Sequence, residues 1–426
     1  MYDNFLKKMK AKLSRSGLFP LREQAQLNLQ ILQERLEMVL PWAMEQSAID
    51  FWIIAARENC MDPILKTLYT WDMPDVRRIG ILAFHRNQKG TVRMMMMGPH
   101  SAEMTGVYEK VQTPDETVWE TLARIVRECA PQKIAVNRSR TDGFFDGLSS
   151  TAYDELREAL GADAEKLCSS DALAMRWLQR VTPLEKKTLQ ALLELTHDLI
   201  AYAFSKQVIE VGKTTTTDLE WFIRDVIKGL GFNYWFGPDV DLQRQGSNNS
   251  KMSNEVIQPG DLLHCDVGIN SPYVQLHTDV QRVAYVLKDG ETDAPHELKE
   301  LLAKGNRLQD IVSGQIKTAK TGNDALLNSV TIAQDEGLKP MVYTHPIGTF
   351  GHGAGPHIGR YDKQEFIPVA GERSIEKQTC FALELNVSEK LKVWDNQQVF
   401  MYLEEVIHTN QAVEFVNGRQ ESLIRV

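Results

Sequence analysis

Several carboxylates lie inside segments that otherwise read as apolar strands. Asp266 ends the run LLHCD, Glu384 interrupts FALELNV, and Glu404 and Glu405 lie within VFMYLEEVI. Burying an isolated carboxylate costs several kcal/mol, so each must be protonated, paired with a cation or bound to a metal. With Asp279 nearby in the chain, acids from separate strands favour one shared site, since neighbouring carboxylates repel unless a divalent ion holds them.

A glycine-rich stretch, Tyr343 to Gly355, is the expected source of an imidazole. It holds His345 and His352, and its glycines suit backbone that another segment or a ligand approaches closely. Either histidine alone is more simply structural, but beside the strand acids we expect His345 to be a ligand. Oxygen ligands plus one imidazole suit manganese, cobalt or zinc.

The elements that must position these residues divide the chain in two. Residues 1–178 alternate helical and strand-like segments, as in an α/β domain. A helix start at Thr182-Pro183-Leu184-Glu185 opens residues 179–426, and Thr217-Asp218-Leu219-Glu220 predicts a second capped helix. Strand-like runs at 262–267, 280–287, 379–387 and 399–407, with helical runs at 297–316 and 324–333, predict an α+β domain.

Charge and cysteine usage exclude several classes of protein. The chain has 57 acidic and 48 basic residues among 426, a formal charge of −9, so nucleic acid and membrane surfaces are not expected partners. Five scattered cysteines without a CxxC motif indicate reduced thiols. Since the start of the sequence also lacks a secretory signal pattern, a cytoplasmic location is expected.

The order Asp, Asp, His, Glu, Glu resembles the pita-bread metallopeptidases, in the aminopeptidase P and prolidase branch with a creatinase-type N-terminal domain. The motif Pro-Gly-Asp, strand, Asp-x-Gly appears at residues 259–268. Asp279 and Arg282 match the Asp-x-x-Arg stretch, although Gln281 replaces the usual Thr. The gap of 13 between Asp266 and Asp279 is about two residues longer than usual. His345, Gly348 and His352 fit the histidine motif, Glu384 is followed by Leu-Asn rather than Pro-Gly, and Glu404 fits the final acid.

The resemblance implies a fold, a site and a reaction. It implies a pita-bread catalytic domain in which Asp266, Asp279, His345, Glu384 and Glu404 hold two divalent ions, manganese first, with cobalt or zinc as alternatives. By this resemblance Asp279 and Glu404 would bridge the ions, Asp266 would bind one of them, and His345 and Glu384 would bind the other. A bridging hydroxide would attack the peptide, Glu384 would transfer its proton, and His352 would hydrogen-bond the substrate. The implied function is an Xaa-Pro aminopeptidase, commonly a homodimer, acting on proline-containing peptides. A prolidase-type dipeptidase, or a non-peptidase or non-catalytic creatinase-like relative, remains open.

One departure concerns substrate orientation. The peptidases carry a histidine about 17 residues before the first ligand, and here that position is Asn249, with no histidine between His197 and His264. Asn249 or Gln245 takes that place, or substrate is oriented differently. His277 is a candidate substitute, and Arg282 is expected to pair with acids behind the ligands.

Overall fold

The computed structural model describes residues 2–426, which form two compact units. One unit is Ala25–Leu184, and the other joins the chain up to Gln24 to Glu185–Val426. The expected division into 1–178 and 179–426 differs at the start of the chain, because the first helix groups with the C-terminal unit. As functional domains, those two ranges stay a prediction.

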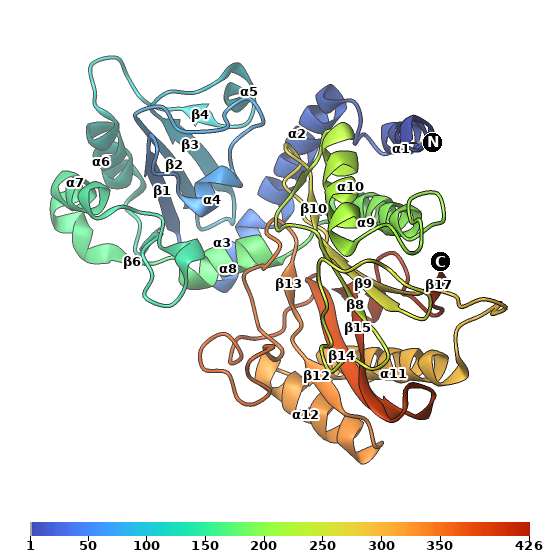
Figure 1. Ribbon diagram of the computed structural model, residues 1–426. Coiled ribbons are helices and arrows are strands. Elements are labelled where there is room, and N and C mark those ends of the chain that lie inside the picture. Colours follow the sequence, from blue (N-terminus) through green and yellow to red (C-terminus); the bar gives the residue numbers. More distant parts are fainter. Residues whose placement is uncertain (1) are drawn as a thin grey trace. The chain divides into compact units, whose positions relative to one another are not determined.

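The N-terminal unit is built on a six-stranded mixed sheet with the order β4-β3-β2-β1-β5-β6 (Figure 1). Its central strand is buried over six successive residues, as a strand covered on both faces must be. β1 runs antiparallel to β2 and parallel to β5, and α6 packs beside α7. The strands are β1 (Phe51–Arg57), β2 (Ile79–Arg86), β3 (Val92–Met97), β4 (Glu109–Lys110), β5 (Ile134–Val136) and β6 (Leu167–Ser169).

The helices of this unit begin mostly at capping side chains. Thr117 and Glu120 form a reciprocal capping box at the start of α6, which satisfies two backbone donors. The helices are α2 (Leu21–Met38), α3 (Leu40–Gln46), α4 (Pro63–Lys66), α5 (Ala102–Thr105), α6 (Val118–Cys129), α7 (Ser150–Leu160) and α8 (Asp171–Gln179), with 3₁₀ turns η1 (Gly143–Phe145) and η2 (Gly161–Lys166).

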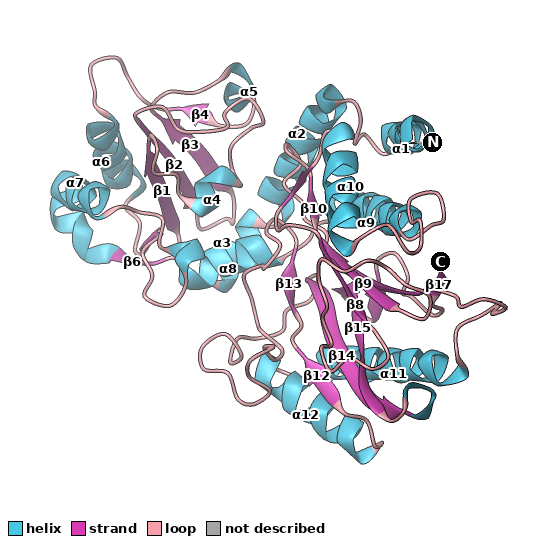
Figure 2. Ribbon diagram, in the orientation of Figure 1, coloured by secondary structure: helices cyan, strands magenta, loops and turns pink. Residues whose placement is uncertain are grey.

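The C-terminal unit contains a nine-stranded sheet with the main order β12-β14-β15-β11-β9-β8 (Figure 2). β13 pairs with β14, β16 with β15 and β17 with β11. The predicted α+β arrangement is therefore present. The strands are β8 (Asp239–Gln243), β9 (Leu262–Val267), β11 (Val280–Tyr285), β12 (Pro340–Val342), β13 (His345–Ile347), β14 (Cys380–Leu391), β15 (Gln397–Thr409), β16 (Val413–Phe415) and β17 (Ile424–Arg425), with a separate pair β7 (Asn233–Tyr234) and β10 (Ile269–Asn270).

α11 packs on β14 and β15, α12 packs on β12, and the two helices pack against each other (Figure 2). α11 approaches β15 so closely that a Cβ on Gly305 would lie 2.6 Å from the Leu403 Cδ1 atom. A larger residue there would require the Leu403 side chain, next to Glu404 on this strand, to move. The helices of this unit are α1 (Tyr2–Ser14), α9 (Pro183–Ala203), α10 (Thr216–Gly229), α11 (His296–Thr318) and α12 (Gly322–Asp335), with the 3₁₀ turn η3 (Lys392–Trp394).

The start of α9 at Pro183 agrees with the predicted helix start, whereas the predicted start of α10 is wrong by two residues. Thr215, not Thr217, is the N-cap, and its partner in the capping box is Asp218. Thr215 and Thr217 each have an acid three residues on, but Glu220 is engaged by Arg224 and the Val240 N–H, whereas Asp218 returns to Thr215. None of the helices formed by residues 2–426 has the length and apolar content needed to span a bilayer.

The sheet register aligns the polar residues of four neighbouring strands. Gln281 on β11 pairs with Asp266 on β9 and with Glu404 on β15, and Glu404 in turn pairs with Glu384 on β14. Directly opposed side chains on neighbouring strands have Cβ atoms about 5 Å apart. The register alone therefore brings three acids and one amide into a row.

Candidate metal centre

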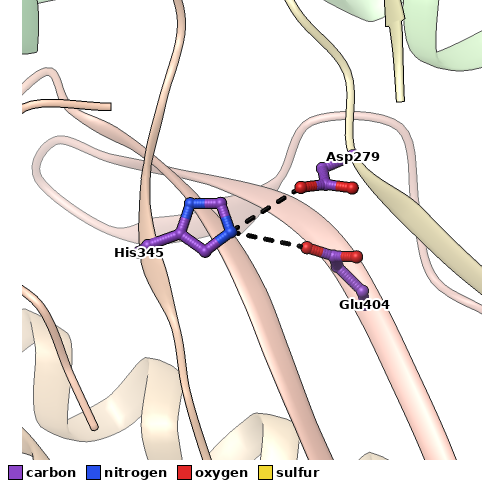
Figure 3. A group of neighbouring side chains, drawn as sticks. All are labelled: Asp279, His345 and Glu404. Atoms are coloured by element: carbon purple, nitrogen blue, oxygen red, sulfur yellow. Dashed lines mark ion pairs between the residues drawn. The ribbon is translucent and has the colours of Figure 1, made fainter. Parts of the chain in front are cut away.

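Asp279, His345 and Glu404 form the first group of converging side chains (Figure 3). Asp279 lies just before β11, His345 begins β13 and Glu404 lies within β15. The His345 Nε2 atom is 3.6 Å from Asp279 Oδ2 and 3.9 Å from Glu404 Oε1. Each residue offers a ligand atom within 4.8 Å of the others, so one small cation could contact all three.

A second group consists of Asp266, Glu384 and Glu404, again with ligand atoms within 4.8 Å of one another. Glu404 is shared by both groups, whereas Asp279, the other bridging ligand that the resemblance implies, lies in the first group alone. Glu384 groups with Asp266 here, whereas the resemblance places it on the same ion as His345. The four acids and one imidazole expected from the sequence are thus gathered at one place in the sheet.

Four atoms in these groups lack a hydrogen-bond partner within residues 2–426. They are Asp266 Oδ1, Asp279 Oδ1, Glu404 Oε1 and His345 Nε2, all shielded from solvent. Buried polar atoms are nearly always satisfied, and an exception calls for a ligand or an ion. Carboxylate oxygens with one imidazole nitrogen are a donor set for a divalent cation, so the residues present fit a metal ion.

Burial dominates the protonation of this centre. It raises the pKa of Asp266 to about 6 and that of Glu384 to about 8, and it raises those of Asp279 and Glu404 well above their ordinary range. Neighbouring carboxylates raise the pKa values of Glu384, Asp279 and Glu404 further. Burial also lowers the pKa of His345 to about 3, so its imidazole is neutral, as a metal ligand must be.

His352 lies beside this centre at the edge of a cavity. Its ring centroid is 4.6 Å from that of His345 and 5.0 Å from that of Trp235, both at edge-to-face angles. The Trp235 indole nitrogen donates to the Thr278 carbonyl, which fixes the ring. The cavity has a volume of about 510 Å³, and its lining includes Tyr343, His345, His352, His357, Arg360 and Glu384.

The three residues expected near substrate or behind the ligands lie in different surroundings. Arg282 pairs with the buried Glu405, which points away from Glu404 because side chains alternate along a strand. The His277 ring nitrogen lies 3.3 Å from the Gly348 carbonyl. Asn249 is exposed, and its side-chain oxygen accepts from the Lys251 backbone N–H.

Sequence reasoning missed a polar chain that reaches the carboxylates from β8. Asp241 contacts His264 Nδ1 at 2.9 Å, and His264 Nε2 lies 3.0 Å from Gln281 Oε1. Lys251 adds a positive charge 3.6 Å from Asp241. Two features of the sequence could have indicated this chain of contacts. His264 lies two residues before Asp266 in a strand expected to be buried, and Gln281 replaces the usual Thr.

Comparisons with known proteins agree with this architecture. The family model described as Metallopeptidase family M24 matches residues 184–411, and no curated protein sequence matches the chain significantly. The fold is similar to that of an X-Pro aminopeptidase from Thermotoga maritima MSB8, with a TM-score of 0.63, 16% identity, and 90% of this chain and 100% of that one covered. An Xaa-Pro dipeptidase from Bacillus anthracis gives a TM-score of 0.62 at 17% identity, covering 93% of this chain and 100% of that chain.

A prolidase from Pyrococcus horikoshii OT3 also aligns along its whole length, with a TM-score of 0.58, 14% identity and coverage of 93% of this chain. These likenesses confirm the predicted pita-bread fold. The family match spans the unit that carries the acids, His345 and His352, and the family depends on divalent metal ions. The chain belongs to metallopeptidase family M24.

Proposed function

We propose that the chain is a dinuclear metal-dependent peptidase that removes the N-terminal residue ahead of proline. Asp266, Asp279, His345, Glu384 and Glu404 would hold two divalent ions, with manganese as the native metal. The observation that carries the proposal is the set of buried oxygen and nitrogen atoms of Asp266, Asp279, Glu404 and His345 that have no partner in residues 2–426. Protein side chains alone leave these atoms unsatisfied, whereas divalent ions would satisfy them together.

When bound, the ions would lower the pKa of a water and polarise the scissile carbonyl. The chain's own residues would then move the proton and hold the substrate. Glu384 lines the cavity and is half-buried, so its carboxylate is placed to take a proton from water and pass it to the leaving nitrogen. His352 lines the same cavity and is positioned to donate a hydrogen bond to the peptide carbonyl.

The choice of proline peptides rests on the structural neighbours. The three neighbours reported above are described as an X-Pro aminopeptidase, an Xaa-Pro dipeptidase and a prolidase. The cavity of about 510 Å³ is of a size typical for small-molecule and short-peptide sites. A homodimer is the assembly that the family resemblance implies, and sedimentation of the purified protein tests it.

The test is a peptide panel with the full chain after addition of manganese, cobalt or zinc. We expect release of the first residue from Xaa-Pro peptides of three or more residues, and no hydrolysis by Asp279→Asn. Glu300→Gln removes an exposed acid on α11 and is the matched control, with activity unchanged. Cleavage confined to Xaa-Pro dipeptides would instead assign a prolidase, and no cleavage with any metal would overturn the proposal.

A further inference from the structure

Gln281 lies at the centre of the second group of acids. Its Nε2 atom is 2.7 Å from Glu384 Oε1, 3.2 Å from Glu404 Oε2 and 3.3 Å from Asp266 Oδ2. These are the three residues whose ligand atoms converge as one of the two candidate cation positions. The side-chain amide therefore lies where a cation coordinated by these acids would lie.

The amide matches this position only in part. A side-chain NH₂ group has two hydrogens to donate, yet three carboxylates surround it, and it carries no net charge. Asp266 Oδ1 remains without a partner in residues 2–426. Hydrogen bonds to charged acceptors are nevertheless among the stronger ones, so the amide is held in place by several of them.

The opposite end of the amide is held by buried groups. Gln281 Oε1 lies 3.0 Å from His264 Nε2, and His264 Nδ1 lies 2.9 Å from the Asp241 carboxylate. Asp241, His264 and Gln281 are each no more than 2% exposed. The side chain thus turns its carbonyl end toward His264 and its NH₂ end toward the acids.

The first group has no such occupant. His345 Nε2, Asp279 Oδ1 and Glu404 Oε1 are all without partners in the described chain. Glu404 thus divides its two oxygens, with Oε1 toward His345 and Oε2 toward the Gln281 amide. An ion can contact these three atoms without displacing a hydrogen bond that residues 2–426 make to them, but an ion in the second group must displace the amide.

We propose that the Gln281 amide competes with the second metal ion: one divalent ion binds at Asp279, His345 and Glu404, and a second binds only by displacing this amide from Asp266, Glu384 and Glu404. This inference rests on the proposed function, since it concerns the same centre. Full metal loading, and any activity that needs both ions, then depends on a higher metal concentration than the first site requires.

The test counts bound Mn²⁺ by equilibrium dialysis and elemental analysis of the full-length protein. Wild type is expected to bind one ion tightly and a second about 10- to 100-fold more weakly, the ratio that corresponds to hydrogen bonds from the amide to charged acceptors. Gln281→Thr is expected to tighten the second ion by about the same factor. Gln281→Glu, which keeps the length but replaces the donor by an acceptor, should do so as well.

Gln243→Thr is the matched control, because Gln243 is a buried glutamine of the same sheet whose amide bonds only the Phe400 backbone among the described residues. It should leave both steps unchanged. Two equally tight ions in wild type would overturn the inference while leaving the proposed function intact. A weaker second ion in Gln281→Thr would also overturn it, by making the carbonyl of Gln281 a ligand. No bound ion in any variant would overturn both.

Discussion

The two units of the molecule each bury carboxylates, and they satisfy them in opposite ways. In the N-terminal unit, the fully buried Asp62 accepts from the backbone N–H groups of Ile64 and Leu65 and from the Asn137 side chain, all at 2.8–3.0 Å. In the C-terminal unit, Asp279 and Glu404 are equally buried, yet each has an oxygen without a partner in residues 2–426.

The comparison teaches that burial alone does not identify a metal ligand. Asp62 caps a short helix, so its side-chain oxygens serve the fold. Asp261, also fully buried, is bonded through both oxygens to Arg244. What distinguishes the candidate centre is that its acids are buried where protein donors are too few.

The largest expected effect comes from removing a carboxylate that lacks a donor. Asp279→Asn should reduce kcat/KM on an Xaa-Pro peptide by at least about 1000-fold, because several kcal/mol of metal-derived stabilisation of the transition state are lost. The urea unfolding midpoint of the metal-free protein should not fall, since burial raises the pKa of Asp279 well above its ordinary range and the change then replaces a neutral carboxyl group by an amide of the same size. If Asp279→Asn kept activity within tenfold of wild type, buried acids without protein donors would not differ in function from buried acids that have them.

A buried acid with a cationic partner should behave differently. Arg282 is the partner of Glu405, whose side chain is 2% exposed, and His197 lies 3.3 Å from the same carboxylate. Arg282→Met should lower the free energy of unfolding by about 3–5 kcal/mol, because it leaves a buried charge without its main counter-ion. The double variant Arg282→Met, Glu405→Leu should recover much of that loss in urea unfolding; an equal loss in both proteins would contradict the explanation.

Loss of the satisfied acid in the N-terminal unit should cost less and leave the metal untouched. At pH 5, Asp62→Ala should lower the free energy of unfolding by about 2–3 kcal/mol, since a helix cap and a partner of Asn137 are removed. Mn²⁺ affinity should equal that of wild type. Asp115→Ala, at an exposed position of the same unit, serves as the control for stability.

The smallest expected effect is a pH dependence of the unfolding free energy that Asp62→Ala loses. Burial raises the pKa of Asp62 to about 6, despite the hydrogen bonds it accepts, whereas the pKa in the unfolded chain is about 3.9. The folded state therefore holds the proton more tightly, and this stabilisation is complete below the unfolded pKa and is lost as pH rises through about 6. The difference between wild type and Asp62→Ala should shrink by about 1 kcal/mol from pH 5 to pH 7.5. A difference that grows with pH would mean that the folded-state pKa is lowered.

Much of this arrangement could be predicted from the sequence because it depends on local patterns. Apolar runs located β9, β14 and β15, and the acids within them marked the centre. The starting residue of α10 was missed because four adjacent threonines compete for one cap. The contacts of Gln281 were not predictable, because they depend on strand register and on a buried partner, His264, from another strand.

The central claim is that divalent metal held by the buried acids of the C-terminal unit performs peptide hydrolysis. The most direct measurement strips the purified full chain with a chelator, confirms the loss of metal by elemental analysis and assays an Xaa-Pro tripeptide before and after Mn²⁺ is returned. We predict that hydrolysis disappears with the metal and returns with it, in wild type but not in Asp279→Asn. Undiminished hydrolysis by the metal-free protein would contradict the account.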